Sequence, residues 1–132
     1  MKTRLAVVAA GALFLLASVP AIAHHSFAAE FDASKPVKLT GTVTKIEWMN
    51  PHAYFYIEVK DESGKVTNWG LEMGSPNGLM RQGWTRNSMK IGDEIVVEGS
   101  AAKDGSNIGN ARSVTLSGGQ RLFAGSSQTT NP

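Results

Sequence analysis

The sequence predicts a small all-β domain, and three observations lead to that prediction. Apolar and polar residues alternate with period two along five separate segments, which is the pattern of half-buried strands. Glycine, proline, asparagine and aspartate gather between these segments, where turns are expected. Only one stretch after residue 23, beginning at Ser75 and Pro76, carries a helix signal.

The first strand is expected over residues 37–48, after a lead segment of residues 24–36. Its apolar residues keep period two as far as Val43 and resume at Ile46 with the phase shifted by one. Such a shift predicts a β-bulge. The Asn50-Pro51 pair should end the strand, because proline cannot donate to a strand ladder.

The second and third strands are expected to pair as an antiparallel hairpin. Residues 52–60 and 65–73 both alternate apolar and polar side chains, and the loop between them ends in Gly64. The apolar side chains expected on the core face are Phe55, Ile57, Val59, Trp69, Leu71 and Met73.

A short helix and two further strands complete the expected domain. Ser75 can cap the helix, and Pro76 fits its first position. Residues 94–101 and 111–116 read as the fourth and fifth strands. The Gly-, Ser- and Thr-rich residues 118–132 read as a flexible tail.

Three strands, a short helix and two strands follow one another in the five-stranded OB barrel. Closure into a barrel also removes the open sheet edges that a small β domain would otherwise expose. We therefore predict an OB-like barrel over residues 37–117. A small open β-sandwich is the alternative, because amphipathic strands alone do not dictate closure.

Residues 1–23 have the three parts of a cleavable signal peptide. Lys2 and Arg4 supply positive charge, residues 5–17 are almost wholly apolar, and small residues precede an expected cut after Ala23. The apolar run of about 13 residues falls short of the roughly 20 that span a bilayer, so no retained anchor is expected. The mature chain should begin at His24 and reside in the periplasm.

Charge and cysteine content narrow the possible chemistry. Without Lys2 and Arg4, the mature chain has 11 basic and 11 acidic residues, so nucleic acid is not an expected partner. The chain has no cysteine, which excludes disulfides, thiolate metal sites and thiol nucleophiles.

Four short motifs together resemble a family of small exported bacterial proteins classed as a domain of unknown function. They are His24-His25-Ser26-Phe27, Glu47-Trp48-Met49-Asn50-Pro51-His52, Gly74-Ser75-Pro76-Asn77 and Lys90-Ile91-Gly92-Asp93. The resemblance covers nearly all of the mature chain and implies no activity. The strand order also resembles that of exported bacterial OB-fold proteins, which concerns the fold only.

The three histidines, His24, His25 and His52, are the candidate metal ligands. After the expected cleavage, His24 would offer its α-amino group and its ring, and His52 a third nitrogen, a set that suits Cu(II). This ligand set resembles the histidine brace of copper proteins. Met49 and Met73 offer sulfur for Cu(I) or serve as core filling. The alternative for the histidines is that they solvate a chain start and cap a turn.

Trp48, Tyr54 and Tyr56 form the second candidate site, an aromatic platform on the sheet face that binds ligands in OB folds. Their rings could stack on a glycan, peptide or small apolar ligand, or simply cover one end of the barrel. The third candidate is the helix start at Ser75, whose amides could hold an anion with Arg81 and Arg86 nearby. A helix cap needs the same residues for structural reasons.

The sequence contains no nucleophile elbow, Walker loop, paired zinc histidines or Rossmann glycine pattern. This favours a non-enzymatic periplasmic binding module for a small molecule, glycan or exported protein. The alternative is a copper-binding or copper-delivery protein that uses His24 and His52.

Overall fold

The computed structural model describes residues 27–125, so the expected signal peptide (residues 1–23), His24 and His25 lie outside the described residues. The elements are α2 (Phe27–Glu30), β1 (Phe31–Glu47), β2 (Tyr54–Lys60), β3 (Val66–Glu72), α3 (Pro76–Arg81), β4 (Glu94–Ala102), β5 (Ile108–Thr115) and β6 (Arg121–Phe123). Within residues 27–125, no helix has the length and apolar character needed to cross a membrane.

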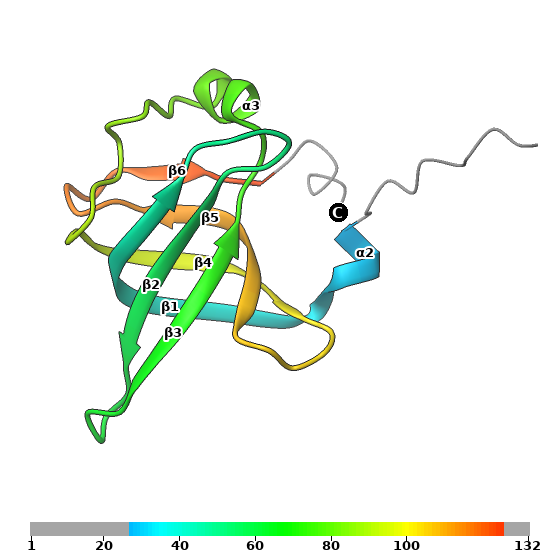
Figure 1. Cartoon of the computed structure of the whole chain (residues 1–132), viewed down its shortest axis with the longest axis vertical. Helices are drawn as coiled ribbons and strands as arrows, with labels where there is room; N and C mark the ends of the chain where they lie inside the picture. Colours follow the sequence, from blue (N-terminus) through cyan, green and yellow to red (C-terminus); the bar gives the residue numbers. More distant parts are fainter. Residues whose placement is uncertain (1–26, 126–132) are drawn as a thin grey trace, which may run out of the picture.

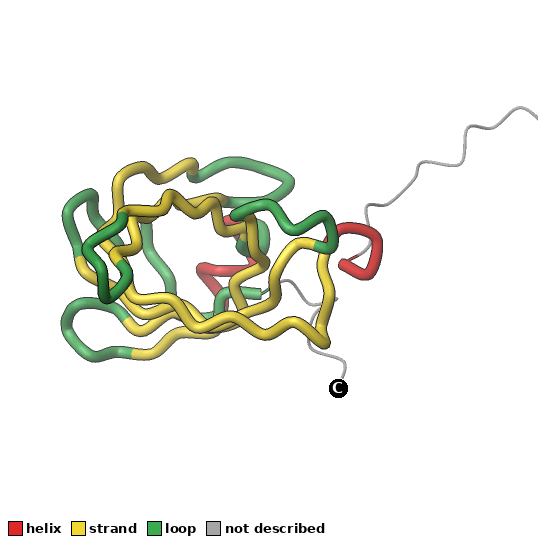
Figure 2. Tube along the Cα trace, turned by 90° about the horizontal axis from the view of Figure 1, so that it is seen from below, coloured by secondary structure: helices red, strands yellow, loops and turns green. Residues whose placement is uncertain are grey.

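The strands close into the predicted five-stranded barrel. Their order is β3-β2-β1-β4-β5-β6, and β3 also pairs with β5. That last pairing is parallel and closes β1 to β5 into a ring, with β6 added outside it on β5 (Figure 1). Seen from below, the strands surround a closed interior with α3 across one end (Figure 2). The closure confirms the OB-like order and excludes the open sandwich.

β1 holds the barrel together because it pairs with β4 along its first part and with β2 along its last part. The register between β1 and β2 shifts between Val43 and Lys45, which confirms the predicted bulge. Gly41 lies just before it. A Cβ atom there would come within 2.7 Å of the Glu58 carbonyl oxygen, so the strands can approach closely only at a glycine.

β1 begins earlier than expected, since part of the predicted lead segment 24–36 already pairs with β4. Phe31 and Asp32 lie opposite Ala102 and Ala101, and the register then shifts before Pro36. The Asp32 carboxylate accepts hydrogen bonds from the backbone N–H and hydroxyl of Ser34, which shapes this irregular turn. Phe31 is buried, and its ring lies 5.7 Å from that of Phe27.

The region between β3 and β4 closes one end of the barrel. Ser75 caps α3 as predicted, with Pro76 in the first turn. Leu79 and Trp84 are buried against the core. The indole N–H of Trp84 donates to the Phe123 carbonyl oxygen at 2.8 Å. This hydrogen bond links the region between β3 and β4, which we call the lid, to β6.

The chain after Gly118 is not entirely tail, because β6 pairs with β5. Leu122 is buried, and the Ala124 amide donates to the Arg112 carbonyl. The sequence analysis missed this strand because the surrounding residues are polar, although Leu122 and Ala124 belong to the buried core. Residues 126–132 of the expected tail lie outside the described residues.

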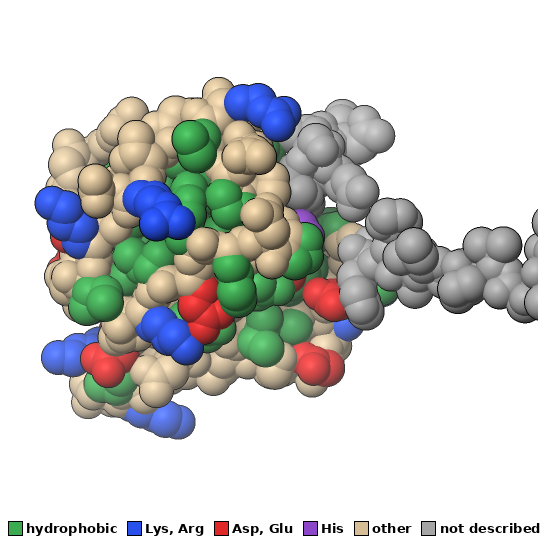
Figure 3. Space-filling view, turned by 45° about the horizontal axis from the view of Figure 1, so that its top comes forward, with side chains coloured by type: hydrophobic (Ala, Val, Ile, Leu, Met, Phe, Trp, Pro, Cys, Tyr) green, Lys and Arg blue, Asp and Glu red, His purple; other side chains and the backbone are tan. Residues whose placement is uncertain are grey.

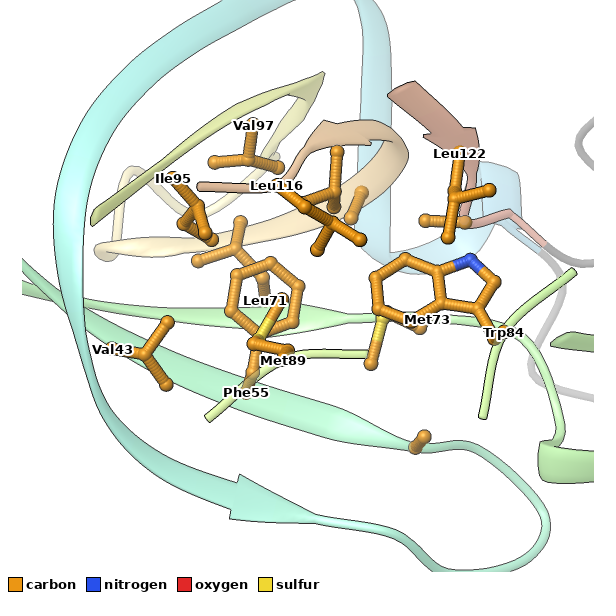
Figure 4. Close-up of a cluster of buried hydrophobic side chains, with 14 of the residues drawn as sticks. Val43, Phe55, Leu71, Met73, Trp84, Met89, Ile95, Val97, Leu116 and Leu122 are labelled. Atoms are coloured by element: carbon orange, nitrogen blue, oxygen red, sulfur yellow. The ribbon is translucent and has the colours of Figure 1, made fainter. Parts of the chain in front are cut away.

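The core fills the barrel interior with side chains from every strand and from the lid. Phe55, Leu71 and Met73 from the β2–β3 hairpin point toward Trp84 and Met89 of the lid (Figure 4). Period-two burial in β2 and β3 follows the alternation read from the sequence. No side-chain nitrogen or oxygen within residues 27–125 is buried without a hydrogen-bond partner.

We expect Gly99→Ala to lower the free energy of unfolding by about 1–3 kcal/mol, as overpacking does in a tight site. A Cβ at Gly99 would collide with the Asn110 carbonyl oxygen at the β4–β5 register shift. Gly118→Ala is the matched control, because nothing lies within 4 Å of its Cβ position. Urea unfolding measures both variants, and equal stability of the two would contradict the close approach.

Candidate functional site

A pocket of about 430 Å³ opens on the outer side of the barrel. It lies between α2, the first residue of β2, the last residue of β3 and the β4–β5 loop; α2 and that loop lie on the same side of the barrel in Figure 1. The lining residues are Ala29, Glu30, Phe31, Tyr54, Glu72, Ala102, Lys103, Asp104, Ser106 and Ile108. We call this cavity the α2 pocket.

Tyr54 forms one wall of the α2 pocket through an ordered phenol. It lies opposite Glu72 in the β2–β3 register, and its hydroxyl donates to Glu72 Oε2 at 3.0 Å. Burial raises the pKa of Tyr54, and the Glu72 charge, its hydrogen bond and the Glu30 charge raise that pKa further. The hydroxyl therefore stays protonated and keeps its donor role.

His52 lies beside the same carboxylate in the loop before β2. Its Nδ1 is 2.9 Å from the Met73 carbonyl oxygen, and since a carbonyl only accepts, Nδ1 carries the hydrogen. In the neutral ring the lone pair is then on Nε2. The Glu72 Oε1 atom is 3.6 Å from Nδ1, so Glu72 sits between the imidazole and the Tyr54 phenol.

The hairpin sets this arrangement through its backbone. The Ala53 amide donates to the Gly74 carbonyl and the Met73 amide to the Ala53 carbonyl, which extends the β2–β3 ladder beyond the strands. His52 is thereby held next to Met73. Its side chain is 33% exposed and that of Glu72 is 12% exposed, so the carboxylate is the deeper group.

The structure brings together only part of the expected aromatic platform. Tyr54 and Tyr56 share the outer face of β2, whereas Trp48 packs against the core. Tyr56 covers Gly70 of the neighbouring strand, where an added Cβ would lie 3.1 Å from the ring. The Lys45 ammonium lies 5.3 Å from the Tyr56 ring centroid. Of the three platform residues, only Tyr54 lines the α2 pocket.

Of the three candidate metal ligands, the structure places His52 only, because His24 and His25 lie outside the described residues. Within residues 27–125, no three His, Cys, Asp or Glu side chains are grouped as a metal site would require. Met73 is buried in the core, while Met49 is 46% exposed.

The third candidate, at the start of α3, performs a structural task. The Ser75 hydroxyl accepts a hydrogen bond from the Gly78 amide at 3.1 Å, as an N-cap does. α3 has only six residues, and Arg81 and Arg86 are exposed. These observations fit a helix cap.

Sequence reasoning missed the groups that build the α2 pocket around Tyr54. The pairing of Glu72 with Tyr54 could have been predicted from the sequence. Counting residue pairs along the two strands from the turn at residues 61–64 places Glu72 opposite Tyr54. Phe31, Ile108 and the loop residues carry no local signal. They meet Tyr54 only because β3 pairs with β5 and β1 starts early.

Tyr54→Phe tests the environment of the phenol by spectrophotometric titration. The wild type has two tyrosines, Tyr54 and Tyr56, and the variant keeps only Tyr56. An ordinary tyrosine ionises near pH 10, whereas Tyr54 should stay protonated, so both proteins should form the same amount of phenolate up to about pH 11. Above about pH 10, Tyr54 loses its proton in the unfolded chain but keeps it in the folded protein, because folding raises its pKa. The contribution of Tyr54 to the free energy of unfolding is therefore lost as the pH rises above about 10. Extra phenolate in the wild type near pH 10 would contradict a half-buried Tyr54 that is hydrogen-bonded to Glu72.

Comparison with known proteins identifies the family of this chain. One family model, described as "Family of unknown function (DUF6152)", matches residues 12–112 of the 132 in the chain. The four motifs that carry the sequence resemblance all lie within the matched residues, as do all residues lining the α2 pocket. No curated protein and no solved structure matches the chain. Because the match covers well over half of its length, the chain belongs to the DUF6152 family.

Proposed function

We propose that this protein is an exported, non-enzymatic binding module that holds a small ligand, or a side group of a glycan or exported partner protein, in the α2 pocket. The observation that carries the proposal is the pocket itself, at the β2–β3 surface beside the β4–β5 loop. OB folds bind their ligands at this surface and with this loop. That argument is one of fold analogy and locates the site without naming the ligand.

The size and lining of the α2 pocket support a small organic ligand. Its volume of about 430 Å³ lies in the range of small-molecule sites. Phe31, Tyr54, Ala102 and Ile108 offer apolar contact, while the Tyr54 hydroxyl and nearby carboxylates offer a few polar contacts. An apolar floor with few convergent polar groups is typical of binding sites.

The export part of the proposal depends on residues 1–23, whose charged start, apolar stretch and small residues are typical of a cleaved signal. The binding part does not depend on it. Charged side chains of both signs are interspersed over the face in Figure 3.

Ile108→Ala tests the pocket with benzyl alcohol as a neutral probe, followed by amide chemical shifts in an NMR titration. Ile108 lines the pocket and is 46% exposed, so its truncation should cost about 1 kcal/mol of contact and weaken binding about fivefold. Ile91→Ala, at a side chain 70% exposed and outside the pocket lining, should bind as the wild type does. Shifts that avoid the pocket amides would contradict the proposed site.

A second candidate function, copper binding or delivery, is favoured by the orientation of His52. Its Nδ1–H donates to a backbone carbonyl with a carboxylate nearby, and metal-binding histidines are commonly fixed in this way. Nε2 then has a lone pair for a metal. If the mature chain begins at His24, three residues separate its α-amino group and ring from Phe27. An extended chain of three residues reaches about 10 Å, so these groups would lie within about 10 Å of Phe27. His25 is a further possible ligand.

Cu(II) titration of the form that begins at His24 tests this candidate. His52→Ala, or acetylation of the His24 α-amino group, should each weaken Cu(II) binding by about tenfold or more, because each removes a nitrogen ligand. An extra residue at the C-terminus is the matched control and should change nothing. Unchanged affinity in both test variants would rule out the three-nitrogen site.

A further inference from the structure

We propose that the α2 pocket selects a small organic cation, a ligand with an ammonium group and an apolar body. This inference rests on the proposed function and names the class of ligand that the same site takes. It follows from which charges line the pocket, how deep they lie, and what apolar surface surrounds them.

The charged side chains that line the α2 pocket are mainly acidic. Glu30, Glu72 and Asp104 carry carboxylates, and Lys103 is the one basic side chain among the lining residues. Asp104 accepts hydrogen bonds from the amide and hydroxyl of Ser106, and these bonds lower its pKa, so it stays ionised at neutral pH. In Figure 3, Asp and Glu side chains also lie on the right of the molecule, the side on which Figure 1 places α2.

Glu72 is the carboxylate best placed to meet a bound ammonium. It is 12% exposed and lies at the pocket wall, between the Tyr54 hydroxyl and the His52 ring. The hydrogen bond from Tyr54 orients the Glu72 carboxylate through its Oε2 atom. A charge-assisted hydrogen bond to a carboxylate is stronger than a neutral one, and strongest where water is partly excluded.

Tyr54 lies against one of these carboxylates, since its hydroxyl donates to Glu72 Oε2 at 3.0 Å. Burial raises the pKa of Tyr54 most, and the Glu72 charge, the Glu72 hydrogen bond and the Glu30 charge raise it further, because nearby carboxylates disfavour a second negative charge. The same field favours a positive charge at that place. The Tyr54 ring can also receive a cation on its face.

Lys103 is the one basic side chain among the lining residues, so the carboxylates of Glu30, Glu72 and Asp104 outnumber it and leave a net negative charge there. Its side chain is exposed, and its charge also lowers the pKa of Asp32 outside the pocket lining. Its backbone amide donates to the Glu30 carbonyl at 2.9 Å, which fastens the β4–β5 loop to α2. The β4–β5 loop therefore contributes a wall of the pocket.

The apolar part of the pocket sets the body of the ligand. Phe31 and Ala102 are buried, and Ile108 is half-exposed beside them. Together with Ala29 and the Tyr54 ring, they form a surface for a small ring or short alkyl group. A fully hydrated ion such as ammonium would leave this surface uncovered, so an amine with an apolar group is the better fit.

NMR titration with three probes that share one ring tests the inference: benzylammonium, benzyl alcohol and benzoate at neutral pH. Benzylammonium should bind at the pocket amides about tenfold or more tightly than benzoate, with benzyl alcohol between them. Glu72→Gln should reduce the preference for benzylammonium over benzoate severalfold while benzyl alcohol still binds, because Glu72 is the carboxylate that would contact the ammonium. Glu58→Gln is the matched control, because Glu58 is exposed on β2 and lies outside the pocket lining.

The outcomes separate this inference from the proposed function. Equal binding of the three probes at the pocket amides would overturn the cation preference and leave the binding module standing. Binding of none of them there would overturn both. If Glu72→Gln does not fold, Glu30→Gln replaces it and should reduce the preference, because Glu30 is exposed and contributes to the same field.

Discussion

The parallel pairing of β3 with β5 is the contact on which the rest of the structure depends. Gly70, Leu71 and Glu72 lie opposite Ile108, Gly109 and Asn110, and the Gly70 amide donates to the Asn107 carbonyl oxygen at 3.1 Å. Gly109 permits this approach, since a Cβ there would lie 3.1 Å from both a Leu71 methyl and the Ser100 carbonyl oxygen. Without this pairing, β3 would be an open edge.

Closure also creates the candidate site. It carries Ile108 and the loop before it to the end of β3, where Glu72 and Tyr54 already face each other across the hairpin. The early start of β1 then places α2 on the other side of the opening, fastened through the Glu30 carbonyl. The pocket thus combines one local pair, Tyr54 with Glu72, and walls that arrive from distant parts of the chain.

Features with a local signal could be predicted from the sequence. The bulge after Val43 came from a phase shift in one strand, the Ser75 cap from neighbouring residues, and the β2–β3 hairpin from two alternating runs around a turn. The early start of β1, the strand β6 and the pocket could not be predicted in this way, because they depend on pairing between segments far apart in sequence. The placement of Trp48 on the platform was wrong although alternation contained the answer: Trp48 follows Ile46 by two residues, and both pack against the core.

The central claim, that β3–β5 pairing closes the barrel and thereby forms the α2 pocket, is tested most directly by NMR of the folded protein. The account predicts backbone nuclear Overhauser effects between Leu71 and Gly109 and between Glu72 and Asn110, together with slow hydrogen exchange of the Gly70 amide. A folded protein that lacks these contacts, with a rapidly exchanging Gly70 amide, would have an open sheet and would contradict both the barrel and the site built on it.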